Sequence, residues 1–261
     1  MIKKILTVLL LVLFICCGCG KKKEEITAND LNEIVKRDVI TVGVRTDAYP
    51  FGYLDKKGRH RGYDVAIARV IARGLLGSDK KVKFVKVTAS DRMMKLYSGD
   101  IDMVIATMSV TPKRRELLDF SDPYYIAGQA LLVRKGSRVH SLQDLRKKKA
   151  IIVFGSTSET SLRTAMPTLG IIGYKTYAEA YKALKQGKAE AIVADDTILL
   201  GMALKDPSVV LLPKRYTKEP YAVAFRKGPE SKDLVRSVNF IIEAETKNGN
   251  LKKLKERYNI K

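Results

Sequence analysis

Apolar and polar positions alternate along most of this chain in patterns typical of strands and helices. Residues 39–44 are apolar and largely β-branched, as in a buried strand. Residues 63–75 carry apolar side chains at helical spacing, and Gly74 and Gly77 mark the end of that helix. The first block continues with a strand, a helix capped by Ser90, a second strand and a short helix, which we expect at 82–87, 90–97, 102–106 and from Thr111 and Pro112 onward.

The same rhythm begins again after Tyr125. Strand–helix alternation of this extent predicts an α/β fold with mostly parallel sheets. Two successive blocks predict two lobes, with a ligand between them at the carboxyl ends of the strands. Strands are expected at 129–134, 150–154, 174–177, 191–194, 209–212 and 221–226, and helices at 141–147, from Thr157 or Ser158, and at 178–186, 195–204, 230–247 and 250–258.

The N-terminus carries an export signal. Lys3 and Lys4 supply a positive charge, and residues 5–15 are apolar except for Thr7. A membrane-spanning helix needs about 20 apolar residues. This shorter stretch is therefore typical of a signal peptide.

Cysteine occurs only directly after this apolar stretch, so the rest of the chain offers no disulfide, thiolate metal ligand or thiol nucleophile. Gly18 before Cys19 resembles a bacterial lipobox, in which the cysteine is diacylated. Cys17 is the alternative, and Cys16 stands where a leucine is commoner. A short anchor helix with incidental cysteines is the competing interpretation.

We therefore predict a lipoprotein signal peptide at 1–18, and a lipid anchor and tether with a lead-in helix at 19–37. The protein is expected outside the cytoplasm, anchored to a bacterial membrane, in the periplasm or at the cell surface.

The formal net charge of +21 raises the question of nucleic-acid binding. The basic residues are spread along the whole chain, the densest runs at 21–23 and 146–149 are short, and tryptophan is absent. No aromatic and basic cluster resembles a base-stacking platform. We therefore interpret the charge as a basic solvated surface, whose field attracts anionic ligands or anionic lipid, and expect no nucleic-acid partner.

Templates for catalysis are nearly absent. The two histidines, His60 and His140, lie beside basic residues in turn-like contexts and are interpreted as surface residues. The sequence contains no nucleophile elbow, no phosphate-binding loop that ends in Lys-Ser/Thr, and no His-Glu-x-x-His zinc motif. No catalytic residue, metal or cofactor is predicted. The helix start at 155–158 instead offers backbone N–H groups and hydroxyls to a carboxylate or a phosphate.

Charged residues follow several predicted strands at their carboxyl ends. Arg45, Arg92 and Arg114 do so in the first block, where guanidinium groups form bidentate hydrogen bonds with carboxylates. A ligand with two carboxylates would explain three cations at one cleft, and ordinary surface arginine is the alternative. In the second block, Asp195 and Asp196 can cap a helix or hold an ammonium group.

Beyond these patterns, the chain resembles the amino-acid-specific solute-binding proteins of ABC importers over residues 39–258. Each matching segment is weak alone, and their joint order and spacing are specific. They include Val42-Gly43-Val44-Arg45, Gly62-Tyr63-Asp64-Val65, Ser109-Val110-Thr111-Pro112, Phe120-Ser121-Asp122-Pro123 and Gly155-Ser156-Thr157-Ser158.

The resemblance implies a hinged, two-lobe periplasmic-binding-protein-like fold of type II, in which each lobe is a mostly parallel sheet flanked by helices. Lobe 1 would comprise residues 38–126 and 221–261, and lobe 2 residues 127–220. Closure of the lobes on an amino acid, recognised by an ABC permease in the membrane, is the implied mechanism. The protein is expected to be a monomer.

The resemblance also implies roles for individual residues. Arg114 would bind the α-carboxylate and Asp195 the α-ammonium group, and Thr107 and Ser109 would add hydrogen bonds beside them. From lobe 2, the helix start with Ser156 and Thr157 would close on the ligand.

The identity of the ligand depends on the remaining cations. Arg45 and Arg92 match positions that are cationic in glutamate/aspartate-binding members. Members that take basic amino acids tend to have an acidic residue near Arg45 and a tyrosine at Ala48, and we expect neither here. Two buried cations are costly without an anionic ligand between them. L-glutamate or L-aspartate is therefore the expected ligand.

Three alternatives stay open at this point. The first is glutamine or another polar amino acid, with Arg45 pointing into solvent. The second is an enzyme of the cyclohexadienyl dehydratase type on the same fold, which needs an acid in the cleft aimed at a leaving group. The third is a sensor input domain, which needs a transmembrane helix and an output domain.

Overall fold

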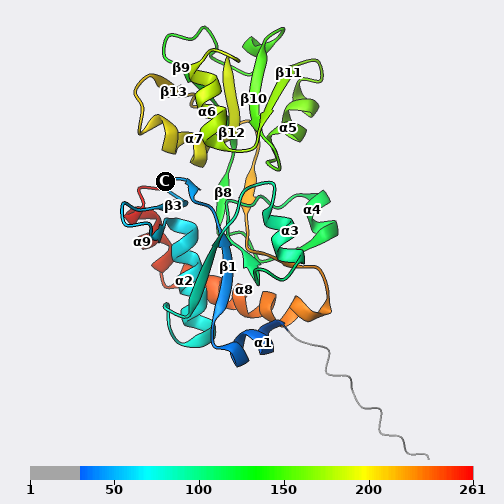
Figure 1. Ribbon diagram of the computed structural model, residues 1–261, viewed down its shortest axis with the longest axis vertical. Coiled ribbons are helices and arrows are strands. Elements are labelled where there is room, and N and C mark those ends of the chain that lie inside the picture. Colours follow the sequence, from blue (N-terminus) through cyan, green and yellow to red (C-terminus); the bar gives the residue numbers. More distant parts are fainter. Residues whose placement is uncertain (1–29, 261) are drawn as a thin grey trace, which may run out of the picture.

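A computed structural model describes residues 30–260 and shows two lobes joined by crossing strands (Figure 1). The expected signal peptide at 1–18 and the lipidation candidates Cys19 and Cys17 lie outside the described residues. The helix α1 (Asp30–Arg37) opens the described chain and corresponds to the expected lead-in helix.

The first sheet has the order β5-β1-β6-β15-β7. Residues of one strand alternate between its two faces: Met103 and Phe225 join one apolar cluster, and Val104 and Ala224 join another. The helices α1, α2, α8 and α9 contribute to the first cluster, and α3 to the second. The strands are β5 (Val82–Lys86), β1 (Ile40–Val44), β6 (Met103–Val104), β15 (Ala224–Arg226) and β7 (Leu118–Phe120), and the helices are α2 (Tyr63–Leu76), α3 (Arg92–Tyr97), α4 (Pro112–Leu117), α8 (Lys232–Lys247) and α9 (Asn250–Arg257).

The second sheet has the order β11-β10-β12-β9-β13. Ile151 and Val153 face a cluster completed by α6 and α7, and Ala150 and Ile152 face one that includes Leu162 of α5. Each lobe is thus a sheet covered by helices on both faces. The elements are β9 (Gln129–Arg134), β10 (Lys149–Val153), α5 (Ser158–Ala165), β11 (Gly170–Tyr174), α6 (Tyr177–Lys185), β12 (Ala191–Asp195), α7 (Asp196–Ala203) and β13 (Val209–Leu211).

The chain passes between the lobes on β8 (Tyr125–Ala127) and β14 (Glu219–Tyr221), which pair antiparallel. In each sheet, one strand runs against the others: β15 pairs antiparallel with β6 and β7, and β9 with β12 and β13. Both reversed strands come directly after a crossing, so they begin at the cleft and run away from it. The remaining strands run toward the cleft, which is why their carboxyl ends gather there.

Several predicted elements differ from the structure. The strand expected at 174–177 is found earlier in the chain, where β11 covers Gly170–Tyr174, and α6 already begins at Tyr177. The helix expected at 141–147 is a single 3-10 turn (Gln143–Leu145). The strand expected at 221–226 is divided between β14 and β15 because the chain leaves the crossing pair before it joins the first sheet. A 3-10 turn (Pro229–Ser231) precedes α8 where one helix was expected from 230.

Smaller differences concern single residues. Asp91, and not Ser90, stands at the N-cap of α3. A small sheet of β2 (Asp47–Ala48), β3 (Gly52–Leu54) and β4 (His60–Arg61) was not predicted. Its His60 is half-buried, with its ring 5.4 Å from that of Phe84, which corrects its interpretation as a surface residue.

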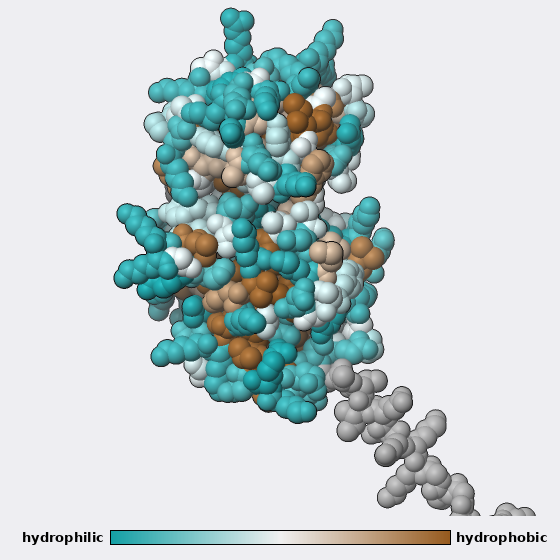
Figure 2. Space-filling model, in the orientation of Figure 1, coloured by the Kyte–Doolittle hydropathy of each residue, from teal (hydrophilic) through white to brown (hydrophobic). Residues whose placement is uncertain are grey.

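The outer surface is mostly hydrophilic on the face shown in Figure 2, and it narrows where the two lobes meet. Among residues 30–260, no helix combines the length and the apolar character needed to cross a bilayer.

Candidate ligand-binding site

A small pocket lies between the lobes. The structure brings all eight predicted ligand-binding residues together around it, from strand ends and helix starts far apart in the sequence. Its lining consists of Arg45, Ala89, Arg92, Thr107, Ser109, Arg114, Ser156, Thr157, Tyr177, Asp195 and Ile198.

Arg114 is positioned by the start of α4. Thr111 caps this helix by accepting a hydrogen bond from the backbone N–H of Arg114 (3.2 Å), with Pro112 at the first helical position, as predicted. The guanidinium group donates to the carbonyl of Ser109 (2.6 Å) and, across the cleft, to that of Gly155 (3.0 Å). Burial lowers the pKa of Arg114, while the charges of Asp195 and Glu219 act in the opposite direction.

Thr107 presents an unpaired hydroxyl to the pocket. Its φ of 46° is unusual for a threonine, and its backbone N–H donates to the buried carboxylate of Asp64 (2.8 Å). The Oγ1 atom of Thr107 is buried without a hydrogen-bond partner in the structure. Because buried polar atoms are usually paired, this hydroxyl is a natural contact for a ligand. Burial raises the pKa of Asp64 to about 6.

On the other side of the pocket, Asp195 stands at the N-cap of α7 but makes no side-chain capping bond. Its carboxylate accepts hydrogen bonds from Tyr221 Oη (2.6 Å) and from Gln129 Nε2. Burial raises the pKa of Asp195 to about 7, and the nearby charge of Glu219 adds to the effect. A ligand ammonium group beside this carboxylate would favour its ionised form.

Ser156 and Thr157 enter the pocket just before α5. Thr157 is the N-cap residue of this helix, and its hydroxyl donates to Glu219 (3.1 Å) in the crossing strand β14. The Ser156 hydroxyl donates to the carbonyl of Val153 (2.6 Å). Gly155, which precedes them, has a φ of 76° and lies so close to lobe 1 that a Cβ atom there would be 2.4 Å from the carbonyl oxygen of Ala89.

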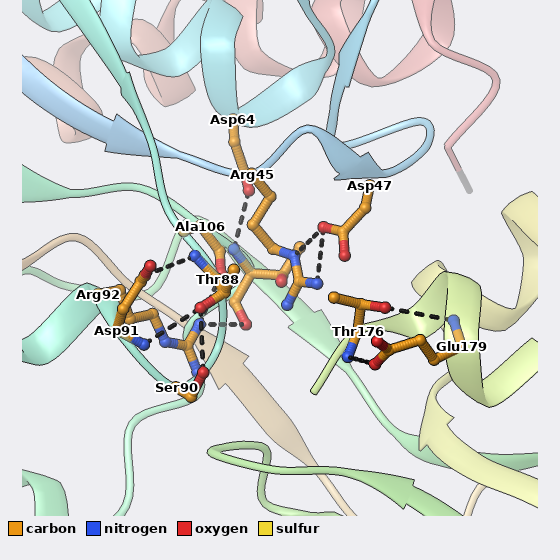
Figure 3. Close-up of polar contacts among 11 residues, drawn as sticks. Arg45, Asp47, Asp64, Thr88, Ser90, Asp91, Arg92, Ala106, Thr176 and Glu179 are labelled. Carbon is orange, nitrogen blue, oxygen red and sulfur yellow. Dashed lines mark hydrogen bonds and ion pairs between the residues drawn. The ribbon is translucent and has the colours of Figure 1, made fainter. Parts of the chain in front are cut away.

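Arg45 is buried at 2% exposure and forms an ion pair with Asp47 (Figure 3). Its Nε and Nη2 atoms both donate to Oδ1 of Asp47, at 2.9 and 2.7 Å, and its guanidinium lies 4.8 Å from the centre of the Tyr177 ring. Burial is the largest influence on Arg45 and lowers its pKa, but the charge and hydrogen bonds of Asp47 together with Tyr177 and Tyr221 more than compensate and leave the pKa raised.

Two expectations are corrected by this geometry. Arg45 does not point into solvent, as the alternative with a neutral ligand assumed. An acidic residue does lie near Arg45, contrary to expectation, because Asp47 follows it by two positions.

Arg92 is buried without such a partner. It opens α3 and donates to the carbonyls of Ala106 (2.7 Å), Thr107 (3.4 Å) and Gly155 (3.4 Å), and the first of these bonds is drawn in Figure 3. Its Nε atom is buried without a partner in the structure. Burial, together with the charges of Arg114 and Arg45, lowers the pKa of Arg92 to about 9.

Sequence reasoning missed several residues around the pocket. Glu219 and Tyr221 lie on the crossing strand β14, and neither residue was given a role in the site. Gln129 starts β9 and bonds to Asp195 and Thr157. These residues share one signal: they are polar residues at the points where the chain changes lobes. Within residues 30–260, no group of three or more His, Cys, Asp or Glu side chains is arranged to hold a metal ion.

Comparison with known proteins places the chain in a family. Residues 40–261 match the family described as bacterial extracellular solute-binding proteins, family 3. The chain belongs to this family. The resemblance deduced from the sequence motifs and the two-lobe fold are therefore confirmed for this solute-binding protein.

Its relatives include proteins named for different ligands. The ABC transporter glutamine-binding protein GlnH of Bacillus subtilis (strain 168) is 39% identical over 248 residues, covering 91% of this chain and 90% of that protein. The glutamate/aspartate import solute-binding protein of Salmonella typhimurium is 29% identical over 255 residues, covering 92% and 84%. The crystal structure of a cysteine-binding protein from Campylobacter jejuni has a TM-score of 0.83 at 30% identity, covering 88% of this chain and 92% of that one. The expected likeness to the glutamate/aspartate-binding members in particular is not confirmed.

Proposed function

We propose that this solute-binding protein is the amino-acid-binding component of an ABC importer and that its ligand is L-glutamine. The observation that carries the choice of ligand is the ion pair that the buried Arg45 forms with the more exposed Asp47. The greater identity to a glutamine-binding relative than to a glutamate/aspartate-binding one supports it.

The charges around the pocket do not require an anionic ligand. Each arginine has a carboxylate within electrostatic reach: Arg45 has Asp47, Arg114 has Asp195 and Glu219, and Arg92 has Asp195. Buried charges are costly chiefly when they are unpaired. Glutamate or aspartate was expected on the condition that Arg45 and Arg92 are buried cations without partners, and Arg45 does not meet this condition because it pairs with Asp47.

In the proposed complex, Arg114 binds the α-carboxylate in a bidentate manner, and Asp195 accepts from the α-ammonium group. Thr107 and Ser109 add hydrogen bonds from lobe 1, and Ser156 and Thr157 from lobe 2. The side-chain amide reaches toward Arg45 and Arg92, whose N–H groups suit its carbonyl oxygen.

L-glutamate is the second candidate, and a specific observation favours it. Arg92 lacks a carboxylate partner of its own and has a buried, unpaired Nε atom. A ligand side-chain carboxylate would satisfy both its charge and its hydrogen bonding.

We further propose that the protein acts by binding alone. Both oxygens of Asp195 accept hydrogen bonds from neighbouring side chains, so this carboxyl group is held as a fixed acceptor. Anchoring through diacylated Cys19, with Cys17 as the alternative, would keep the protein beside its permease on the outer side of a bacterial membrane. Lobe closure on the ligand would create the form that the permease recognises.

Isothermal titration calorimetry tests this function. The full chain is purified in detergent, freed of bound amino acid by unfolding and refolding, and titrated separately with glutamine, glutamate, aspartate and arginine. We expect glutamine to bind at least about tenfold more tightly than the other three, a difference of about 1.4 kcal/mol. Tighter binding of glutamate would make the second candidate correct, and no binding of any of the four would refute the amino-acid assignment.

A further inference from the structure

Asp47 lies outside the ligand pocket but against its wall. Arg45 lines the pocket, whereas Asp47 lines a larger neighbouring groove between the lobes. Tyr177 lines both spaces. The wall between them therefore includes the Arg45–Asp47 ion pair, the Tyr177 ring and Ile198, which also lines both spaces, and Figure 3 shows Asp47 reaching the guanidinium from the side.

The local backbone fixes this ion pair. Asp47 and Ala48 form β2, in which Asp47 pairs with Tyr53 of β3. Gly52 of β3, which pairs with Ala48, lies so close to Arg45 that a Cβ atom there would be 2.5 Å from the Arg45 carbonyl oxygen. Asp47 thus stays within reach of the guanidinium because β3 holds the segment against the end of β1.

The pair determines which charge a ligand meets. The Arg45 side chain is 2% exposed and that of Asp47 31%, so the guanidinium is shielded from solvent while its carboxylate partner is partly exposed on the side of the groove. The carboxylate of Asp47, at 2.7 Å from Nη2, offsets the positive charge of Arg45. Without it, Arg45 would join Arg92 as a second buried cation that has no carboxylate bonded to it directly.

We infer that Asp47 is a specificity-determining residue that acts through Arg45. By cancelling the charge of this arginine, it favours a ligand with an amide side chain over one with a carboxylate. This inference rests on the proposed function, because it concerns the same pocket. Asp47 does not line the pocket itself, so its role is to position and neutralise Arg45.

The variant Asp47→Asn tests the inference, because asparagine keeps a hydrogen-bond acceptor of the same shape and removes the charge. Asp38→Asn is the matched control: it removes the same charge from the exposed partner of Lys81, at the opposite end of β1. Dissociation constants for glutamine and glutamate are measured by calorimetry on the full chain. We expect Asp47→Asn to shift the ratio of the two constants toward glutamate by about tenfold or more, and Asp38→Asn to leave this ratio within about twofold.

A double variant separates a charge effect from a structural one. In the Arg45→Met background, the further change Asp47→Asn should leave the ratio unchanged, since the arginine through which Asp47 acts is gone. An equal weakening of both ligands by Asp47→Asn, or the same shift with and without Arg45, would overturn the inference.

The wild-type protein tests the function separately. If it already prefers glutamate, the proposed ligand is wrong, while a further shift toward glutamate in Asp47→Asn would still support the role of Asp47. If the wild-type protein binds neither amino acid, both the ligand and the specificity role are refuted.

Discussion

At the scale of single residues, the pocket contains a carboxyl group that titrates near neutral pH. Burial raises the pKa of Asp195 from 3.8 to about 7. A bound ammonium group requires the ionised form, so protons and ligand compete for this residue. The effect of pH on folding has the opposite sign. Between pH 3.8 and about 7, the folded chain holds the proton of Asp195 more tightly than the unfolded chain does. The contribution of Asp195 to the free energy of unfolding therefore falls as the pH rises through that window.

We expect the affinity for the amino acid to fall about twentyfold as the pH is lowered from 7.5 to 5.5. Titration calorimetry at several pH values in this range measures it. In Asp195→Asn, binding should be much weaker and nearly independent of pH over the same range. A constant wild-type affinity would mean that Asp195 does not contact the ammonium group.

The residues around the pocket were partly predictable. Strand ends of an α/β fold converge, so charged residues that follow strands were expected to meet, and the eight predicted residues do line one pocket. The partner of Arg45 was missed, although residues two apart in an extended segment face the same side. Glu219 was missed because it is 62 residues from Thr157 in the sequence, and only the path of the crossing strand brings the two residues together.

At the scale of elements, the loop between β10 and α5 joins the lobes across the cleft. The carbonyl of Gly155 accepts hydrogen bonds from Arg114 and Arg92, and its backbone lies in the left-handed region against the carbonyl of Ala89. A side chain at this position would therefore hold the two lobes apart.

We expect Gly155→Ala to weaken amino-acid binding by about tenfold or more, because its Cβ atom would clash with lobe 1 in the closed form. Gly187→Ala is the control: Gly187 has a similar φ of 74°, but a Cβ atom there meets nothing within 4 Å. Both variants should lose about 1–2 kcal/mol of stability in urea denaturation. Equal affinities in calorimetry would show that this contact does not limit closure.

The element pattern located most strands, including the edge strands β5 and β13, but misplaced the edge strand β11 and the helix expected at 141–147. The strand β11 is at the edge of its sheet and carries Gly170 and Gly173, so its sequence gave a weak strand signal and the position was assigned too late. The turn at 141–147 is stabilised by the Asp144 carboxylate, which accepts from the backbone N–H groups of His140 and Ser141. This local bonding replaces the helix that the sequence pattern favoured.

At the scale of the whole molecule, the two lobes lie against each other. The ammonium group of Lys205 in lobe 2 lies 5.0 Å from the centre of the Tyr49 ring in lobe 1, and Ala48 packs into an apolar cluster of lobe 2. Closed contacts of this kind are expected to depend on ligand that bridges the lobes.

We expect glutamine to reduce the radius of gyration of the refolded, ligand-free protein in small-angle X-ray scattering. The reason is that ligand contacts from both lobes favour the closed form. Asp195→Asn should show no such change at the same glutamine concentration. A wild-type radius that stays constant at saturating glutamine would contradict lobe closure.

The interleaving of the two sheets also determines an order of events during synthesis. The second sheet draws all its strands from one continuous segment, β9 to β13, whereas the first sheet needs β15 between β6 and β7. All five strands of the second sheet are therefore synthesised before β15, which the first sheet needs to join β6 to β7. The N-terminal half of this protein must wait for the C-terminal part, and until then its edge strands at β6 and β7 remain open to non-native pairing.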